Sequence, residues 1–187
     1  MIREVILTTL SPEGVPHLAP MGVHVLEDGG YLVMPFRPSR TLDNLFATQT
    51  AVMNYVDDVR IFAGCLTGRR DWPVVPTEHI TGVRLADALG HVEMVLERYE
   101  DDPVRVRFYC RKIHESVHRP FQGLNRAQAA ILEAAILVSR LDRLPVERIR
   151  SEIEYLTIAI EKTAGPLEKE AWDWLMARVD HHIGTLS

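Results

Sequence analysis

The hydrophobic residues follow two different periods along this chain of 187 residues, and the change comes near residue 120. Before that point, apolar residues alternate with polar ones or form short runs between turn signals, which is typical of β-strands. After it, they recur every three or four residues, as on one face of an amphipathic helix. Strands followed by helices predict an α+β protein, because a parallel α/β sheet would need the two kinds of element to alternate.

Six or more strands are expected in the first part. Ile2–Leu10 is rich in β-branched residues and ends at Ser11-Pro12-Glu13-Gly14, a turn sequence. The other expected strands are Val15–Leu26, Tyr31–Phe36, Ala51–Val56, Val83–Tyr99 with a break near Gly90, and Val104–Cys110. A short helix is expected over Thr41–Thr48, where apolar residues stand at helical spacing. Residues 59–82 stay ambiguous, because Gly and Pro interrupt any long element.

Three helices are expected in the second part, over Leu124–Leu141, Val146–Ala164 and Leu167–Ile183. Pro145 stands where it can open the second, and Gly165-Pro166 separates the second from the third. The sequence therefore predicts a strand domain over residues 1–119 and a helical C-terminal subdomain over residues 120–187.

Composition and charge narrow the class of protein. Hydrophobic residues make up 47% and charged residues 25%, and the net charge is −5, so a broadly basic surface for nucleic acid is not expected. Cys65 and Cys110 form no CxxC motif and predict free thiols in a reducing compartment. No signal-peptide pattern and no run of about 20 apolar residues stands out, so we expect a cytoplasmic protein without a membrane partner.

The stretch HESVH, residues 114–118, has the pattern of a zinc hydrolase motif. That chemistry needs both histidines on one face of a helix, so that two imidazoles meet one zinc ion and the glutamate reaches its bound water. Here the preceding residues alternate as a strand, and Pro120 disfavours helix at Arg119. We interpret HESVH as a polar strand end and expect no metal. A zinc hydrolase using His114, Glu115 and His118 is a remote alternative.

The stretch RPSRTLDN, residues 37–44, joins a predicted strand to a predicted helix. A helix N-terminus offers free N–H groups and the positive end of its dipole to an anion, and two arginines add cationic donors. The residues are therefore suited to a monophosphate, but they suit an ordinary helix cap with solvated arginines equally well. Neither a P-loop nor a GxGxxG motif is present.

Several stretches resemble a known family. HLAPMGV (residues 17–23), RPSRTLDNL (37–45) and AVMNYVDD (51–58) resemble the FMN-binding split barrel of the flavin reductase type. PFQGLNRAQAAILEAAILVSRL (120–141) and EKTAGPLEKEAW (161–172) are similar to motifs of a family known only as domain of unknown function 447. That family pairs such a barrel with a helical C-terminal part, and it occurs in methanogens and in bacteria with tetrahydromethanopterin-linked one-carbon metabolism.

The resemblance implies an antiparallel split β-barrel of Greek-key type followed by a three-helix segment, with FMN as cofactor. It implies a homodimer with FMN at the subunit interface. Carried over, the phosphate site comprises Arg37, Ser39, Arg40, Thr41 and Asn44. The strand beside the flavin ring comprises Ala19, Pro20, Met21, Gly22 and Val23, and Asn54 is a weaker polar contact. Gln122, Asn125 and Arg126 form either a helix cap or a second polar contact near the flavin or a substrate.

The activity that the resemblance implies is that of an oxidoreductase, which passes a hydride through FMN to a small molecule in a one-carbon or methanopterin setting. A non-catalytic FMN-binding carrier or assembly protein is the alternative. No residue stands out as a nucleophile or a general base.

Overall fold

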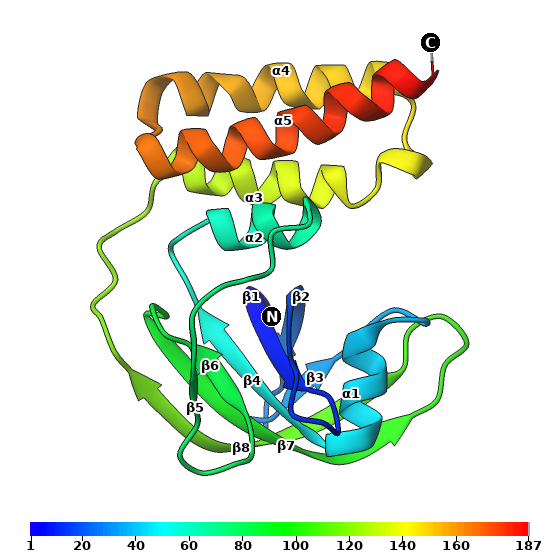
Figure 1. The fold of residues 1–187 in the computed structure, drawn as a ribbon, viewed down its shortest axis with the longest axis vertical. Helices are drawn as coiled ribbons and strands as arrows, with labels where there is room; N and C mark the ends of the chain where they lie inside the picture. The colour runs from blue at the N-terminus through cyan, green and yellow to red at the C-terminus, as the bar shows by residue number, and fades with distance from the viewer. Residues whose placement is uncertain (187) are drawn as a thin grey trace. The chain divides into compact units, whose positions relative to one another are not determined.

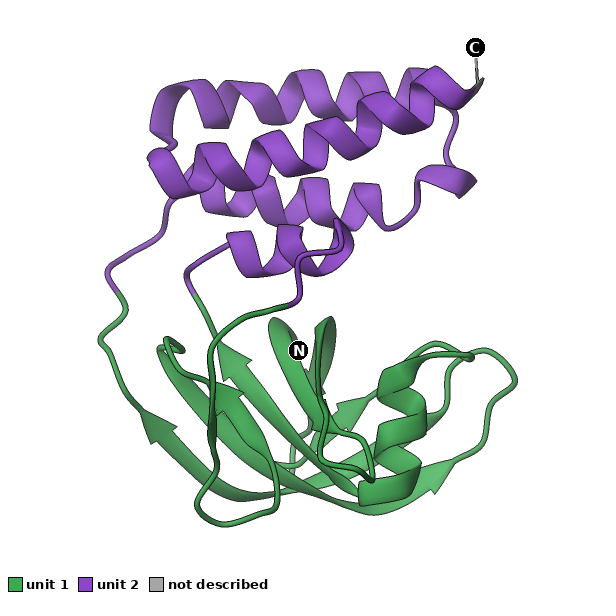
Figure 2. Cartoon of the chain, in the orientation of Figure 1, with its two compact units in different colours: residues 1–56, 71–121 green, residues 57–70, 122–187 purple. Residues whose placement is uncertain are grey.

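The computed structural model describes residues 1–186, which form two compact units (Figure 2). The barrel unit comprises Met1–Val56 and Asp71–Phe121. The helical unit comprises Asp57–Arg70 and the chain from Gln122 onward. This division differs from the expected one in the segment Asp57–Arg70, which belongs with the helices. Ile61 and Phe62 of that segment are buried among them, and an apolar helix face needs such a partner.

The barrel unit is built from antiparallel strands, which close in the order β1-β2-β3-β8-β7-β4 (Figure 1). The barrel strands are β1 (Ile2–Leu10), β2 (Pro16–Val25), β3 (Tyr31–Val33), β4 (Thr50–Tyr55), β7 (Gly90–Glu100) and β8 (Arg107–Val117). A two-stranded ribbon, β5 (Val74–Pro76) and β6 (Val83–Leu85), lies between β4 and β7 in the chain, and α1 (Arg40–Thr48) follows β3. Of residues 59–82, which the sequence left ambiguous, β5 and its following loop take the end, and α2 (Arg60–Leu66) takes the start.

Alternate residues of the strands fill the barrel, because successive side chains of a strand point to opposite faces. Val5, Leu7, Met53, Val92 and Met94 are at most 1% exposed. Two leucines of α1, Leu42 and Leu45, join the same core. Burying a leucine side chain is worth about 1.5–3 kcal/mol, so this contact accounts for the docking of α1 on the barrel.

The helical unit contains α2 (Arg60–Leu66), α3 (Arg126–Val138), a 3₁₀ turn (Leu141–Arg143), α4 (Val146–Thr163) and α5 (Pro166–Leu186). The three long helices run alongside one another (Figure 1). Ala127, Ile131, Ile149 and Leu175 are fully buried among them. Within the described part of the chain, no helix is long and apolar enough to cross a membrane.

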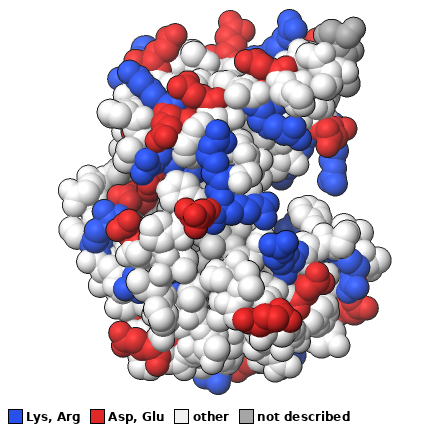
Figure 3. All heavy atoms as spheres, in the orientation of Figure 1, with Lys and Arg blue, Asp and Glu red and all other residues white. Residues whose placement is uncertain are grey.

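The predicted α+β architecture is confirmed, with some shifts in the elements. β3 ends at Val33 instead of Phe36, and the last strand runs over Arg107–Val117 instead of Val104–Cys110. HESVH therefore lies mostly in β8, as a strand end, and its two histidines do not stand one helical turn apart. Acidic and basic side chains are interspersed on the face shown in Figure 3, which agrees with the small net charge.

Candidate functional site

The N-terminus of α1 is capped by Ser39, whose backbone is extended. The Leu42 N–H donates to Ser39 Oγ at 3.2 Å, and the Asp43 N–H donates to the Ser39 carbonyl at 3.1 Å. In this geometry the N–H groups of Arg40 and Thr41 have no acceptor within the helix. The cap therefore leaves two backbone donors and the Ser39 hydroxyl proton for an anion at this end of α1.

Two arginines flank this helix end, and both are exposed. Arg37 Nη2 lies 2.7 Å from Asp101 Oδ1, with 41% and 75% of the two side chains exposed. An ion pair this exposed contributes only about 0–1 kcal/mol. Arg37 can therefore exchange Asp101 for a doubly charged phosphate at little cost.

Arg105 is a cation that the sequence interpretation missed. Its Nε and Nη2 donate to the Met34 carbonyl at 3.0 and 2.8 Å, and its guanidinium lies 4.5 Å from the Phe36 ring centroid. Asp102 Oδ1 accepts from the backbone N–H groups of Arg105 and Val104, which lowers the pKa of Asp102. Arg105 thus holds the chain between β3 and α1 in place. The alternation around Arg105 suggested a strand, which hid this contact.

Thr41 and Asn44 are buried on the inner face of α1, each 3% exposed. Asn44 Nδ2 donates to Thr9 Oγ1 of β1 at 3.0 Å. This bond ties α1 to the barrel wall. Asn44 therefore orients the helix end that carries Ser39 and Thr41.

The strand segment expected beside a flavin ring is part of β2. Ala19, Pro20, Met21 and Gly22 are half-buried, and Val23 is fully buried. Over residues 1–186, β2 pairs with β1 along Pro16–His24, but with β3 only at His24 and Val25. The edge of β2 that faces away from β1 therefore has no strand paired to it from Ala19 to Val23.

Packing against the neighbouring strand accounts for glycine at position 22. A Cβ at this position would lie 3.1 Å from both Glu4 Oε1 and Ile2 Cγ2 of the neighbouring strand. These contacts are tighter than most real Cβ contacts, so a side chain here would press on β1. Close approach of a ring is therefore not needed to account for this glycine.

Asn54 lies inside the wall of the barrel unit and is fully buried. Its Nδ2 donates to the Ile6 carbonyl at 2.9 Å, and its Oδ1 accepts the Leu85 N–H at 2.8 Å. The side chain joins β1, β4 and β6. Both polar atoms of the Asn54 side chain are thus hydrogen-bonded within the barrel unit, and the residue stabilises the fold instead of contacting a ligand.

Gln122, Asn125 and Arg126 belong to the helical unit. Asn125 caps α3: its Oδ1 accepts from Ala127 N–H at 2.7 Å and from Gln128 N–H at 3.3 Å, while its Nδ2 donates to the Thr163 carbonyl at 3.1 Å. These bonds account for Asn125 as a helix cap. Arg126 lines a groove between α3 and α4, and Gln122 is exposed.

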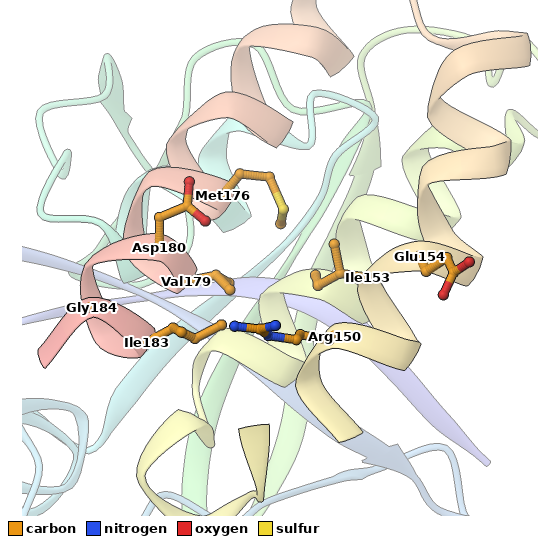
Figure 4. Close-up of a pocket in the computed structure, with 8 residues that line it drawn as sticks. All are labelled: Arg150, Ile153, Glu154, Met176, Val179, Asp180, Ile183 and Gly184. Carbon is orange, nitrogen blue, oxygen red and sulfur yellow. The ribbon is translucent and has the colours of Figure 1, made fainter. Parts of the chain in front are cut away.

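The hollow between α4 and α5 has a different character (Figure 4). Ile153, Met176 and Val179 line it together with charged side chains, and Arg150 lies beside Ile183 in it. Among residues 1–186, no group of three or more His, Cys, Asp or Glu side chains could hold a metal ion. The strand geometry of HESVH also removes the helical arrangement that the zinc mechanism requires. The α1 end of the barrel unit is the better candidate site.

A six-stranded antiparallel barrel that is open along β2, with a capped, cation-flanked helix after β3, is a flavin reductase-like split barrel. The chain belongs to the DUF447 family. Residues 3–119 match the model described as "Protein of unknown function (DUF447) N-terminal domain", and residues 125–177 match "Protein of unknown function (DUF447)". No curated protein matches the chain in sequence.

Solved structures agree with this assignment of the fold. The FMN-bound DUF447 protein MM1853 from Methanosarcina mazei is 20% identical with a TM-score of 0.80, over 95% of this chain and 94% of that one. Nitrilotriacetate monooxygenase component B from Mycobacterium thermoresistibile is 16% identical with a TM-score of 0.56, over 65% of this chain and 73% of that one. The 2-nitrobenzoate 2-nitroreductase NbaA from Pseudomonas fluorescens is 20% identical with a TM-score of 0.54, over 61% of this chain and 64% of that one.

Proposed function

We propose that the barrel unit binds FMN, with the phosphate at the N-terminus of α1 and the ring along the open edge of β2. The observation that carries the proposal is the helix end itself, where a Ser39 cap, two unpaired backbone N–H groups and two exposed arginines stand together. The similarity to MM1853, which is described as FMN-bound, supports it.

The donors at the helix end suit a phosphate monoester. Such a group carries close to two negative charges and three acceptor oxygens, and it is favoured where N–H groups and a helix dipole converge. Arg37 and Arg40 supply the opposite charge, while Ser39 and Thr41 supply hydroxyls. Asn44 and Arg105 act indirectly, because their bonds fix the helix and the chain that leads into it.

The open edge of β2 suits a flat, polar ring. Between Ala19 and Val23, the backbone groups that point away from β1 are not used by strand pairing, so they can meet the heteroatoms of a ring. Pro20 has no N–H, which leaves a carbonyl without a competing donor at that position. Ala19–Gly22 supply half-buried contacts against one ring face.

The reaction we propose is the passage of a hydride through bound FMN from a reduced nicotinamide or deazaflavin to a small substrate. FMN would supply the redox chemistry, while the chain holds the group and limits its access to water. The thiols of the chain are unsuited to redox work, because burial raises the pKa of Cys65 to about 11 and that of Cys110 to about 12. A pterin is the first acceptor to test, given the one-carbon setting that the family resemblance implies.

We also propose a homodimer with FMN at its interface. Phe36, Tyr99 and Val104 are 51%, 53% and 57% exposed, and all three belong to the barrel unit that carries the α1 site. Tyr99 packs edge-on against Phe46 of α1, with ring centroids 5.2 Å apart. An exposed apolar surface of this kind is commonly an interface, and a second copy would cover it.

The decisive experiment is a visible absorption spectrum of the purified protein, with the released small molecule identified by mass. We expect a flavin spectrum and the mass of FMN. A colourless protein that also fails to take up added FMN would contradict the proposal.

A double variant, Arg37→Ala with Thr41→Ala, tests the phosphate site. It should weaken FMN binding by about tenfold to a hundredfold, the effect of losing about 1.4–2.8 kcal/mol of charge-assisted hydrogen bonding. Arg111→Ala is the matched control, since Arg111 is an exposed arginine in an ion pair with Glu97. Full FMN occupancy in the double variant would show that the phosphate lies elsewhere.

Turnover separates an oxidoreductase from a carrier. Under anaerobic conditions, addition of reduced nicotinamide or reduced deazaflavin should bleach the flavin band, and an acceptor should restore it. A protein that holds FMN but is bleached by neither donor would be a carrier or an assembly protein.

A further inference from the structure

Four histidines and a buried glutamate gather on the outer face of the barrel, beside the loop between β5 and β6. His91 and Glu93 come from β7, while His114 lies in β8 and His118 just beyond it. His79 comes from the loop itself, residues 77–82. Val92 and Met94 point into the barrel core, so the alternation of β7 places His91 and Glu93 on the opposite face.

Glu93 holds the loop of residues 77–82 against this face of the barrel. It is fully buried, and its carboxylate accepts three consecutive backbone N–H groups, from Glu78 at 3.2 Å, from His79 at 2.9 Å and from Ile80 at 2.9 Å. Burial works to raise the pKa of Glu93, but the hydrogen bonds from His91 and from the loop outweigh it and hold the pKa below its usual value. The loop is thus attached to an ionised carboxylate.

His91 connects that carboxylate to the surface. Its Nε2 lies 3.2 Å from Glu93 Oε1, and its Nδ1 lies 2.9 Å from Nε2 of His118, which is exposed. An ionised carboxylate only accepts, so His91 Nε2 carries the hydrogen. When His91 is neutral, its Nδ1 accepts, and His118 must donate from Nε2. The hydrogen bonds therefore run in one direction from His118 to Glu93.

Other ionisable groups surround this chain of bonds. The His79 ring packs on that of His114, with centroids 4.1 Å apart, and the His91 and His114 centroids are 5.9 Å apart. Arg84 of β6 and Glu78 of the loop act on His118 with opposite sign. On β8, Lys112 and Glu115 pair with each other at 2.9 Å. From β4, Asn54 stands opposite His91 and is neutral.

We propose that Glu93, His91 and His118 form a pH-sensitive latch, which holds the loop of residues 77–82 on the barrel at neutral pH and releases it in mild acid. The His91–His118 contact can take up one proton and keep its geometry. It cannot take up a second, because both facing nitrogens would then carry hydrogen. Positive charge on His118 is also disfavoured by the nearby guanidinium of Arg84.

The direction of the pH effect follows from the linkage of protonation to loop opening. Burial, then Arg84, then His91 lower the pKa of His118 in the closed form. Opening lets His118 return toward the ordinary pKa of about 6.5, so the closed loop has its full stability above about pH 7 and loses it as the pH falls through that range. Glu93 adds a second loss only in stronger acid, as the pH falls from its ordinary pKa of about 4.3 toward its lowered value.

The neighbouring strand provides an internal reference, because its attachment has no titrating group. The Leu85 N–H donates to Asn54 Oδ1 at 2.8 Å, and Thr8 Oγ1 donates to the Val83 carbonyl. The Asn54 amide and the Thr8 hydroxyl both stay neutral in mild acid. β6 should therefore remain on the barrel when the loop opens.

The test is amide hydrogen exchange of the full-length protein, followed by NMR and expressed as protection factors, between about pH 7.5 and about pH 5.5 on either side of the ordinary histidine pKa. We expect the protection of the His79 and Ile80 amides to fall by up to about tenfold per pH unit, as one linked proton requires. The Leu85 amide should keep its protection. Equal losses at all three amides, or no loss at His79 and Ile80, would overturn the latch.

Two variants and a matched control sharpen the test. His118→Gln should leave the loop protected at neutral pH and remove most of the pH-dependent loss. Glu93→Gln should lower the protection of His79 and Ile80 at every pH, and if that variant does not fold, His118→Gln decides alone. His24→Gln, on β2, is the control and should keep the pH dependence of the unmodified protein. A His118→Gln protein with an unchanged pH dependence would overturn the proposal.

Discussion

Arg37 Nη2 lies 2.7 Å from Asp101 Oδ1, so the most prominent cation of the candidate phosphate site already has an anionic partner in the same unit. The carboxylate is far more exposed than the guanidinium, and it stands where a ligand oxygen would compete. Asp101 therefore acts as a competitor for the phosphate that we propose.

Replacing Asp101 should strengthen FMN binding. Asp101→Asn removes the competing charge, and because an exposed pair is worth about 0–1 kcal/mol, the Kd for FMN should fall by up to about fivefold at low salt. A fluorescence titration of the FMN-free protein measures this. Glu97→Gln, which breaks the similarly exposed Arg111–Glu97 pair, is the control. A weaker affinity in Asp101→Asn would mean that Asp101 positions Arg37 and does not compete.

Asn125 should matter for stability and not for FMN binding. Asn125→Ala removes the cap of α3, which should cost about 1 kcal/mol, with an upper value near 2 kcal/mol. Chemical denaturation followed by circular dichroism gives this number. Glu133→Ala, at an exposed position of the same helix, is the control and should change the free energy of unfolding by less than about 0.5 kcal/mol. If Asn125→Ala weakened FMN binding with no loss of stability, the cap interpretation would be wrong.

The two cysteines should be almost unreactive in the folded protein. Burial raises the pKa of Cys65 to about 11 and that of Cys110 to about 12, so few thiolates form near neutral pH. Labelling with a thiol reagent should be slow in buffer and fast in denaturant. Because the pKa is raised by folding, the stabilising contribution of the neutral thiols is complete below about pH 8.5 and declines as the pH rises toward the folded values. Rapid labelling of either cysteine in buffer would contradict the burial described here.

A charge in the exposed apolar surface should separate the proposed dimer. Tyr99→Glu places a carboxylate at a 53% exposed position of the barrel unit, and light scattering should then report the mass of a monomer. Tyr155→Glu is the control, since Tyr155 is 73% exposed on α4. If Tyr155→Glu separated the dimer and Tyr99→Glu did not, the interface would lie on the helical unit.

The capped N-terminus of α1 could be predicted from the sequence because its main parts are local. Arg37, Ser39 and Thr41 stand within five residues, and a serine before an apolar helical run indicates a cap. Thr41–Thr48 and Ile2–Leu10 were predicted within one residue of their observed bounds, because each carries a clear period.

Features that depend on long-range pairing could not be predicted in the same way. Arg105 reaches Met34 across 71 residues, and Glu93 binds backbone groups of a loop that has no period of its own. The register of β7 and β8 also shifts at Glu93/Met94, which decides what faces His114. The sequence of α2 is short and interrupted by glycine, so its helical state depends on burial against α3 and α5.

The path of the chain has a consequence for any attempt to divide this protein. The chain leaves the barrel unit after Val56, returns at Asp71 and leaves again after Phe121, so the helical unit is assembled from two separate stretches. A fragment that stops near residue 120 would keep α2 but lose the helices that bury Ile61 and Phe62. A fragment that starts near residue 122 would lack α2 and leave the matching surface of α3 and α5 bare. Neither unit is one continuous stretch of chain, so no single cut yields both of them intact.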